Sequence, residues 1–544
     1  MKRRTFTMLA LAACIAVPTF ASFAAANDSG DVYDARIGEK EILTPPPPKA
    51  PRINGPKVYG ARPGRIFLYR IPTQGVRPMR FAVENLPDGL KLDAENGILT
   101  GTVPSQRGEY PMTFVAENAY GKAQRPFKLV VGDTIALTPP TGWNSWGGHM
   151  VDVSDAIMRK AADIFVERGL ADVGFQYVGI DDCWMRLNQE MYDTRTPGQI
   201  KKHAAYDYES TGTIGPIRDE YGRILPNGKF PDMKAMCDYI HSKGLKAGIY
   251  CTPGPRTCQG WAGSYGHERA DADRFAEWGF DLLKYDQCSG GKVLAQLRAR
   301  IPGYQVKDFW KPMSDYLRVQ DRDILFNLCQ YGQDDPWTWA PSIGIQSWRI
   351  GGDLNHHVEN YFINALRIAG PLREYSKPGQ WNDPDFMYIH RIKNVGRMAE
   401  PSEEIPLDTN QRYQYVTLWS IIAAPFFFSC DIENIDDFTI GLLTNADVVN
   451  INQDELGHVA EIVRNDDKTE TVMLKKLADG SKVLAVFNRD AQQERTITVS
   501  WGEIGECCEL EVFDVWRQKP LGTYKGGISV LLSPNGVALF RLTN

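Results

Sequence analysis

The stretch Asp281-Leu-Leu-Lys-Tyr-Asp-Gln-Cys288 is the starting point for interpreting the rest of the chain. A short apolar strand, residues 280–283, leads into Lys284, Asp286 and Cys288. These three alternate along the chain, so they point to one face at the carboxyl end of the strand. A lysine beside an aspartate favours the ionised carboxylate, which is a candidate nucleophile. A structural ion pair that closes a strand explains the same stretch equally well, so the surrounding sequence has to decide.

The length and composition limit the class of protein. A chain of 544 residues is too long for one hydrophobic core and indicates about two to four domains. Its formal net charge is −6 and it has no long basic run, which argues against nucleic acid as a partner. No stretch beyond the N-terminal region is long and apolar enough to span a membrane.

The N-terminus predicts export. Lys2, Arg3 and Arg4 precede an apolar run, and residues 24–26 offer a small-residue cleavage site. We expect residues 1–26 to be a signal peptide and the mature chain to be periplasmic, secreted or at the cell surface. The run Leu11-Ala-Ala-Cys14 is an alternative lipoprotein processing box, but the apolar run continues beyond Cys14.

Nine of the ten cysteines would remain after cleavage, an odd number that leaves at least one thiol unpaired. There is no C-x-x-C and no H-E-x-x-H, so we expect no metal site and no other cofactor.

Two β domains are predicted at the ends of the chain. Residues 27–55, with a proline run at 45–48, read as an extended linker. Residues 56–133 alternate between polar and apolar positions and are broken by turn residues, which predicts a small β domain. Within them, residues 86–101 resemble the putative-Ig (cadherin-like) repeats of bacterial surface enzymes, which implies a domain that spaces or docks. Residues 456–544 alternate again and predict an antiparallel β-sandwich.

Residues 134–455 predict a barrel. Short apolar strands alternate with amphipathic helical segments such as residues 155–168 and 233–242. Eight such units, with strands apolar on both faces, are typical of a (β/α)8 TIM barrel, which places its chemistry at the carboxyl ends of its strands. The long polar segment between Trp184 and Phe230 follows the second strand, so we expect it to cover the barrel mouth.

Charged and aromatic residues gather at these strand ends. They are Asp181 and Asp182 after the second strand, Lys284 and Asp286 after the fourth, Arg349 and Asp353 after the sixth, Asp383 and Asp385 after the seventh, and the aromatics Trp146, Trp184, Tyr250 and Trp381. This set suits a pyranose ring, because carboxylates can bind its hydroxyls and an aromatic face can stack on its C–H groups. Glycoside hydrolysis needs two carboxyl groups, and Asp286 and Asp353 are the candidates for nucleophile and acid. Any one of these residues alone could be a helix cap or turn residue, but that explanation fits poorly for all of them at successive strand ends.

Seven ordered motifs in this region closely resemble the family 27 glycoside hydrolases, which are retaining α-galactosidases and their relatives. The motifs are Gly142-Trp-Asn-Ser-Trp146, Ile180-Asp-Asp-Cys-Trp184, Gly244-Leu-Lys-Ala-Gly-Ile-Tyr250, Lys284-Tyr-Asp-Gln-Cys288, Ser347-Trp-Arg-Ile-Gly-Gly-Asp353, Gln380-Trp-Asn-Asp-Pro-Asp385 and Ile451-Asn-Gln-Asp454. The tail, residues 533–542, resembles the C-terminal β domain of that family.

The resemblance implies specific roles. Asp286 would be the nucleophile and Asp353 the acid/base. The sugar would be held by Trp146, Asp181, Asp182, Tyr250, Lys284, Arg349 and Asp385. It also implies a disulfide between Cys258 and Cys288.

One motif departs from the family. After the fifth strand the family often has Cys-Glu-Trp, whereas this chain has Cys329-Gln330-Tyr331. That position contacts the 2-substituent of the sugar in relatives, so we assign Cys329 and Gln330 to the sugar site and expect the bulk of Gln330 to favour galactose over N-acetylgalactosamine.

The expected function is a retaining exo-α-galactosidase that acts on oligo- or polysaccharides without a cofactor. The alternatives are a related activity (α-N-acetylgalactosaminidase, β-L-arabinopyranosidase or isomalto-glucan hydrolase) and a non-catalytic carbohydrate-binding protein. The sequence does not predict an oligomeric state.

Overall fold

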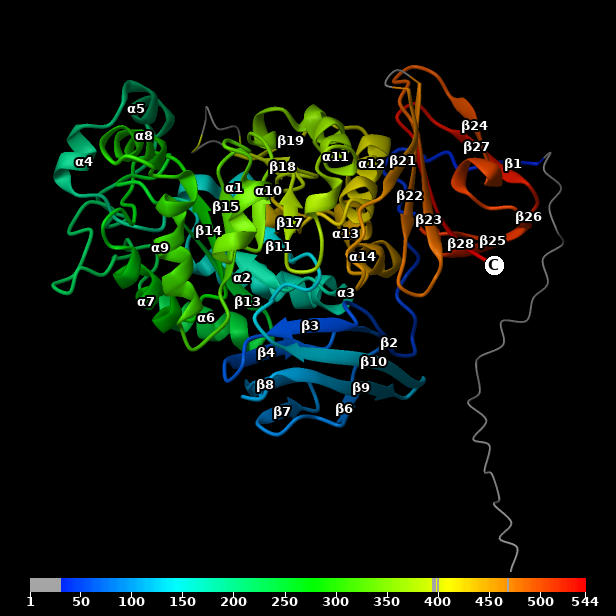
Figure 1. Cartoon of the computed structure of the whole chain (residues 1–544), viewed down its shortest axis with the longest axis horizontal. Coiled ribbons are helices and arrows are strands. Elements are labelled where there is room, and N and C mark those ends of the chain that lie inside the picture. Colours follow the sequence, from blue (N-terminus) through cyan, green and yellow to red (C-terminus); the bar gives the residue numbers. More distant parts are fainter. Residues whose placement is uncertain (1–30, 394–397, 399–400, 467–468) are drawn as a thin grey trace, which may run out of the picture.

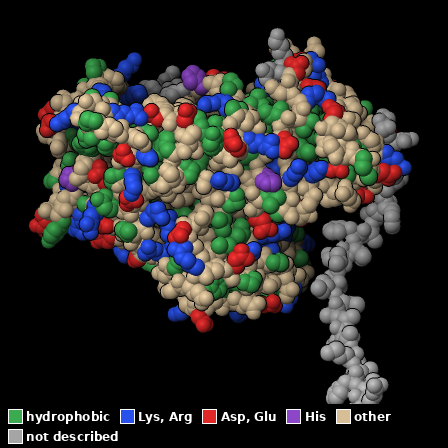
Figure 2. Space-filling model, viewed as in Figure 1, with side chains coloured by type: hydrophobic (Ala, Val, Ile, Leu, Met, Phe, Trp, Pro, Cys, Tyr) green, Lys and Arg blue, Asp and Glu red, His purple; other side chains and the backbone are tan. Residues whose placement is uncertain are grey.

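The computed structural model describes residues 31–393, 398, 401–466 and 469–544. The expected signal peptide and Cys14 lie outside these residues. Figure 1 shows a central barrel, a β-sandwich below it and a second β-sandwich at its side. No helix in the described part of the chain is long and apolar enough to cross a membrane. On the face in Figure 2, basic and acidic side chains are interspersed, so no wide patch of one sign covers it.

The barrel has eight parallel strands in the order β17-β16-β15-β14-β13-β12-β11-β20. Their bounds are β11 Thr141–Asn144, β12 Tyr177–Gly179, β13 Lys246–Cys251, β14 Leu282–Asp286, β15 Leu325–Cys329, β16 Ser347–Arg349, β17 Trp381–Asp383 and β20 Phe426–Phe428. Beyond β17 the two ends of the sheet are linked, because Met387 N–H donates to the carbonyl of Phe427 at 2.8 Å. All residues of these strands are buried, which explains their apolar sequences. The predicted barrel is therefore confirmed.

Helices surround the strands. α2 (Asp155–Glu167) begins at Ser154, whose hydroxyl accepts the N–H of Ile157, and it buries Met158 and Phe165. The other helices are α1 Trp146–His149, α3 Leu170–Val173, α6 Met233–Ser242, α7 Glu268–Trp278, α8 Gly290–Arg300, α9 Val306–Arg318, α10 Pro336–Trp339, α11 Tyr361–Ala369, α12 Thr409–Ile421, α13 Asp437–Leu443 and α14 Ala446–Asn452. Between β12 and α6 the chain adds two short helices, α4 (Gln189–Asp193) and α5 (Pro197–Lys202), at the edge of the barrel (Figure 1).

The N-terminal sandwich packs two sheets around its own apolar core. One sheet has β3 Val58–Ala61, β10 Gly121–Val131, β9 Gly108–Asn118 and β6 Arg80–Glu84; the other has β4 Ile66–Arg70, β8 Ile98–Thr102 and β7 Leu90–Asp93. It contacts the barrel at residues that precede strands. Arg62 pairs with Asp323, just before β15, at 3.0 Å, and Arg70 donates to the carbonyl of Lys243, just before β13. This domain therefore covers the amino-terminal end of the barrel.

Residues 31–50, which we expected to belong to an extended linker, lie against the C-terminal sandwich and α12. β1 (Val32–Asp34) pairs in parallel with β27 (Gly527–Leu532) of the C-terminal sandwich. Further along, Ala35 and Leu43 are buried, and Leu43 N–H donates to the hydroxyl of Tyr413 at 2.9 Å. The composition of this segment could not show the pairing, because its partners lie near the other end of the chain.

The C-terminal sandwich packs on α12. Its larger sheet has β21 Glu461–Asp466, β22 Glu470–Lys476, β23 Lys482–Asn488, β28 Val537–Thr543, β25 Leu510–Asp514 and β26 Lys519–Tyr524; its smaller sheet has β1, β27 and β24 Arg495–Ser500. Trp516 donates its indole N–H to Thr417 of α12 at 2.9 Å. α12 is consequently buried around almost its whole circumference.

Candidate active site

A cavity of about 200 Å³ opens where the carboxyl ends of the barrel strands meet. Pockets for drug-sized ligands are roughly 300–1,000 Å³, so this one suits a single small unit such as one sugar ring. Its lining is Trp146, Asp181, Asp182, Lys202, Tyr250, Cys258, Gln259, Lys284, Asp286, Tyr331, Arg349, Asp353, Asn355, Asp385 and Tyr388. A larger hollow of about 580 Å³, lined by residues such as Arg373 and His458, contains none of the predicted site residues.

Asp286 ends β14 and is held by two phenols. The hydroxyl of Tyr331 donates to its Oδ1, and the hydroxyl of Tyr250 donates to its Oδ2 at 3.4 Å. Burial raises the pKa of Asp286 to about 6, although the charge of Lys284 and the Tyr331 hydrogen bond both act to lower it. Asp286 is thus a fixed carboxylate that is ionised near neutral pH.

Lys284 of β14 lies beside Asp181, which follows β12. Its ammonium forms an ion pair with Asp181 at 2.7 Å, and both side chains are buried. Burial disfavours the ammonium, but Asp181 and other nearby acids hold the pKa of Lys284 well above its ordinary value. Lys284 therefore pairs directly with Asp181, and it favours the ionised carboxylate of Asp286 through its charge.

Asp182 lies beside this pair in a different electrostatic state. Burial, and then the charge of Asp181, raise the pKa of Asp182 to about 7. Its Oδ1 accepts the N–H of Cys183 at 2.7 Å and its Oδ2 accepts the N–H of Gln259 at 3.2 Å. Near neutral pH the two acids therefore differ, since Asp181 is paired with a cation and Asp182 is partly protonated. Together they can accept hydrogen bonds from sugar hydroxyls and donate hydrogen bonds to them.

Arg349 joins two further acids. It pairs with Asp353 at 3.1 Å and with Asp385 at 2.9 Å. The side chain of Asp353 is 44% exposed, whereas that of Asp385 is 1% exposed. Burial raises the pKa of Asp385 to about 7. Asp353 is therefore the acid of this pair that is exposed to solvent.

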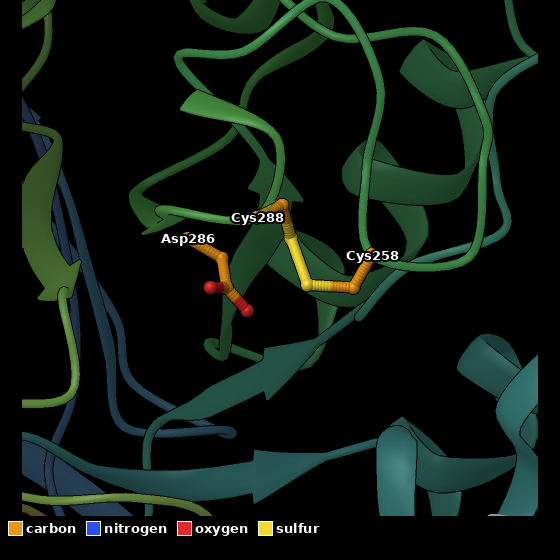
Figure 3. A group of neighbouring side chains, drawn as sticks. All are labelled: Cys258, Asp286 and Cys288. Carbon is orange, nitrogen blue, oxygen red and sulfur yellow. A yellow bond between two sulfur atoms is a disulfide. The ribbon is translucent and has the colours of Figure 1, made fainter. Parts of the chain in front are cut away.

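A disulfide forms part of the wall. Cys258 and Cys288 are bonded, and Figure 3 shows their bridge beside the carboxylate of Asp286. The Sγ of Cys288 lies 3.0 Å from the hydroxyl of Tyr250, and the Sγ of Cys258 lies 3.7 Å from the hydroxyl of Tyr331. The bridge therefore packs against both phenols that hold Asp286.

Cys329 and Gln330, which we assigned to the sugar site, do not line the cavity. Neither do Trp184, Trp381 and Asp383, which we placed among the strand-end residues. Cys329 lies behind the cavity and accepts a hydrogen bond from Arg349 at 3.6 Å. Gln330 is fully buried and donates to Asp334 at 3.3 Å. Its side chain is not part of the cavity lining, whereas that of Tyr331 is.

Five lining residues were missed in the sequence. They are Lys202, Gln259, Tyr331, Asn355 and Tyr388. Tyr331 follows Cys329, the last residue of β15, so its place just beyond a strand end could have predicted that it lines the cavity. Lys202 lies in the insertion, where no pattern distinguished it.

An α/β barrel with a small cavity of carboxylates, cations and aromatic rings at its carboxyl end has the features of a glycoside hydrolase. The family model described as alpha galactosidase A matches residues 138–215 and 202–454, and the alpha galactosidase C-terminal beta sandwich domain matches residues 467–542. The model described as a putative Ig domain matches residues 50–132. Because the first model covers more than half of the chain, the protein belongs to the alpha galactosidase A family.

Individual relatives agree. An α-galactosidase of Cyamopsis tetragonoloba is 33% identical over 414 residues, which are 75% of this chain and 87% of that protein. The crystal structure of a putative alpha-galactosidase/melibiase from Bacteroides fragilis has a TM-score of 0.77 and 34% identity, and covers 91% of this chain and 98% of its own. A β-L-arabinopyranosidase from Geobacillus stearothermophilus, 21% identical with a TM-score of 0.62 over 75% of this chain and 98% of its own, shares the fold. The family resemblance, the fold class and the enzyme class are thereby confirmed.

Proposed function

We propose that the protein is an exo-acting α-galactosidase that removes terminal α-linked galactose with retention of configuration. The observation that carries the proposal is the pairing, in one small cavity, of the buried carboxylate Asp286 with the partly exposed acid Asp353. The size of the cavity favours one terminal ring, which is the exo mode. The curated relatives that carry the name α-galactosidase support galactose as the sugar.

The proposed reaction has two steps. In the first, Asp286 attacks the anomeric carbon while the protonated carboxyl of Asp353 gives its proton to the leaving oxygen. In the second, the carboxylate of Asp353 takes a proton from water, the water oxygen attacks the anomeric carbon, and the bond to Asp286 breaks. Arg349 holds Asp353 in position through both steps, because it stays charged in its buried site.

Asp286→Ala and Asp353→Ala test the roles separately. We expect Asp286→Ala to lose roughly a thousandfold or more of kcat on aryl α-galactosides, because the nucleophile is absent. Asp353→Ala should lose about 10²- to 10⁴-fold on substrates with poor leaving groups and much less on those with very acidic ones, which need no proton. Asp315→Asn, on the exposed face of α9, is the matched control.

The outcome of a substrate panel separates the alternatives. The first sugar released, followed by NMR of its anomeric proton, should be α-galactose. Release of the β-anomer would contradict retention, and full activity in Asp286→Ala would exclude the proposed nucleophile. Faster cleavage of α-N-acetylgalactosaminides, β-L-arabinopyranosides or isomaltose-type glucans would change the substrate and keep the enzyme class. Sugar binding without any turnover would identify a non-catalytic protein.

A further inference from the structure

The insertion between Trp184 and Phe230 contributes one side chain to the cavity wall, that of Lys202 at the end of α5. The helix is fixed against the loop that carries Cys258. Gln199 of α5 donates to the carbonyl of Cys258 at 3.4 Å. The ring of His203, which follows the helix, is buried between the hydroxyl of Tyr208 at 2.9 Å and Oε1 of Gln259 at 3.3 Å. Lys202 is therefore held on both sides by docked neighbours.

The cations of the cavity differ in their pairing. Lys284 is paired with Asp181, and Arg349 is paired with Asp353 and Asp385. Among the residues that the structure describes, the ammonium of Lys202 has no ion pair and no hydrogen bond to another side chain. It is partly buried, whereas Lys201 beside it is exposed. A partly buried cation without a partner inside a binding cavity is available to a ligand.

We propose that Lys202 binds an anionic substituent, a carboxylate or a sulfate ester, on the sugar next to the terminal galactose. This rests on the proposed function. The rest of the cavity is unsuitable for an anion, because five aspartates line it and two of its three cations are already paired. Lys202 comes from outside the barrel strands, on the inserted segment, and Lys202 is less buried than Lys284 and Arg349. The insertion thus selects acidic glycans as substrates.

The test compares leaving groups that differ in charge. Three aryl α-galactosides, one neutral, one with a carboxylate and one with a sulfate ester on the leaving group, are assayed with the wild type, Lys202→Met, Lys202→Arg and the control Lys201→Met. The measured quantity is selectivity, the ratio of kcat/KM for the anionic substrate to that for the neutral one. We expect Lys202→Met to lower selectivity about five- to tenfold, an effect of about 1 kcal/mol. Lys202→Arg should retain it, and Lys201→Met should match the wild type.

The results distinguish failure of this inference from failure of the proposed function. In the wild type, selectivity should fall as salt is added, because the contact is between charges near the surface. An unchanged selectivity in Lys202→Met, or an equal loss on neutral and anionic substrates, would overturn the inference, since Lys202 would then only balance the acids of the cavity. Turnover of the neutral substrate reports independently on the galactosidase activity. A thermal unfolding midpoint equal to that of the wild type shows that a variant is folded.

Discussion

The hydroxyl of Tyr331 is the closest hydrogen-bond donor to the carboxylate of Asp286. A hydrogen bond to the charged form lowers a carboxyl pKa, so it opposes the burial that raises the pKa of Asp286 to about 6. We expect activity to fall below about pH 6, where Asp286 becomes protonated and cannot attack. In Tyr331→Phe the pKa of Asp286 should rise, which moves the acid limb of kcat/KM to higher pH by about one unit.

The pH profile of kcat/KM on a neutral aryl α-galactoside measures this shift, because that parameter reports ionisations of the free enzyme. Tyr304→Phe is the matched control, since Tyr304 lies outside the cavity. If Tyr331→Phe loses activity equally at every pH, the Tyr331 hydroxyl contributes to turnover without tuning the pKa of Asp286.

The sequence predicted most of these individual residues for a simple reason. Asp181, Asp286 and Arg349 lie at or directly after strand ends, and in a barrel those ends meet at one place. Tyr331, which lines the cavity, was not singled out beside Gln330, because the direction of a side chain beyond a strand depends on loop geometry. Tyr331 has a left-handed backbone with φ 57°, a conformation that favours glycine, and nothing local in the sequence predicts it.

Among the elements, the insertion between β12 and α6 is fastened by one buried ion pair. Arg218 pairs with Asp271 of α7 through two contacts, of 2.5 and 3.0 Å, and the side chains are 10% and 0% exposed. Asp271→Asn leaves Arg218 without its countercharge in a buried place, which costs about 3–5 kcal/mol. We expect local loosening of the insertion, faster proteolysis near the exposed Tyr221, and a lower kcat/KM because α5 forms part of the cavity wall.

Limited proteolysis with mapping of the first cleavage checks this expectation. Glu277→Gln is the control, because Glu277 contacts Arg223 of the same insertion at 3.5 Å but is 54% exposed, and exposed pairs contribute little. If Asp271→Asn is cut first elsewhere, the ion pair does not fasten the insertion. If the variant keeps full activity while the insertion is cleaved, the insertion is not part of the active site.

Helices and strands could be predicted where their burial produces a regular pattern of apolar residues in the sequence. The eight strands are buried on both faces and α2 buries one face, so both leave apolar patterns of the right length. β1 leaves no such pattern, since it has three residues and only one is even partly buried. Its pairing with β27 joins the two ends of the chain, a contact that no local pattern can encode.

At the scale of the whole molecule, the N-terminal sandwich and the active site lie at opposite ends of the barrel. The sandwich contacts residues before β13 and β15, and no residue before Trp146 lines the cavity. Its contribution should therefore appear in stability and be absent from the chemistry. The ion pair of Arg62 with Asp323 offers the best test of an effect on stability without an effect on catalysis, since the side chain of Arg62 is only 8% exposed.

Arg62→Ala removes the countercharge of Asp323, although the backbone N–H of residue 62, now 2.9 Å from Asp323, can still donate to that carboxylate. Breaking a largely buried ion pair costs about 3 kcal/mol, so the unfolding midpoint should fall clearly. We expect kcat and KM on a small aryl α-galactoside to stay at wild-type values below that midpoint. Arg107→Ala is the control, since its pair with Asp133 is exposed on both sides and should leave the midpoint unchanged. A lower kcat in Arg62→Ala, at a temperature where the variant is fully folded, would contradict this expectation. It would mean that a change at the sandwich alters the active site through the barrel strands, so the barrel does not isolate the two ends from each other.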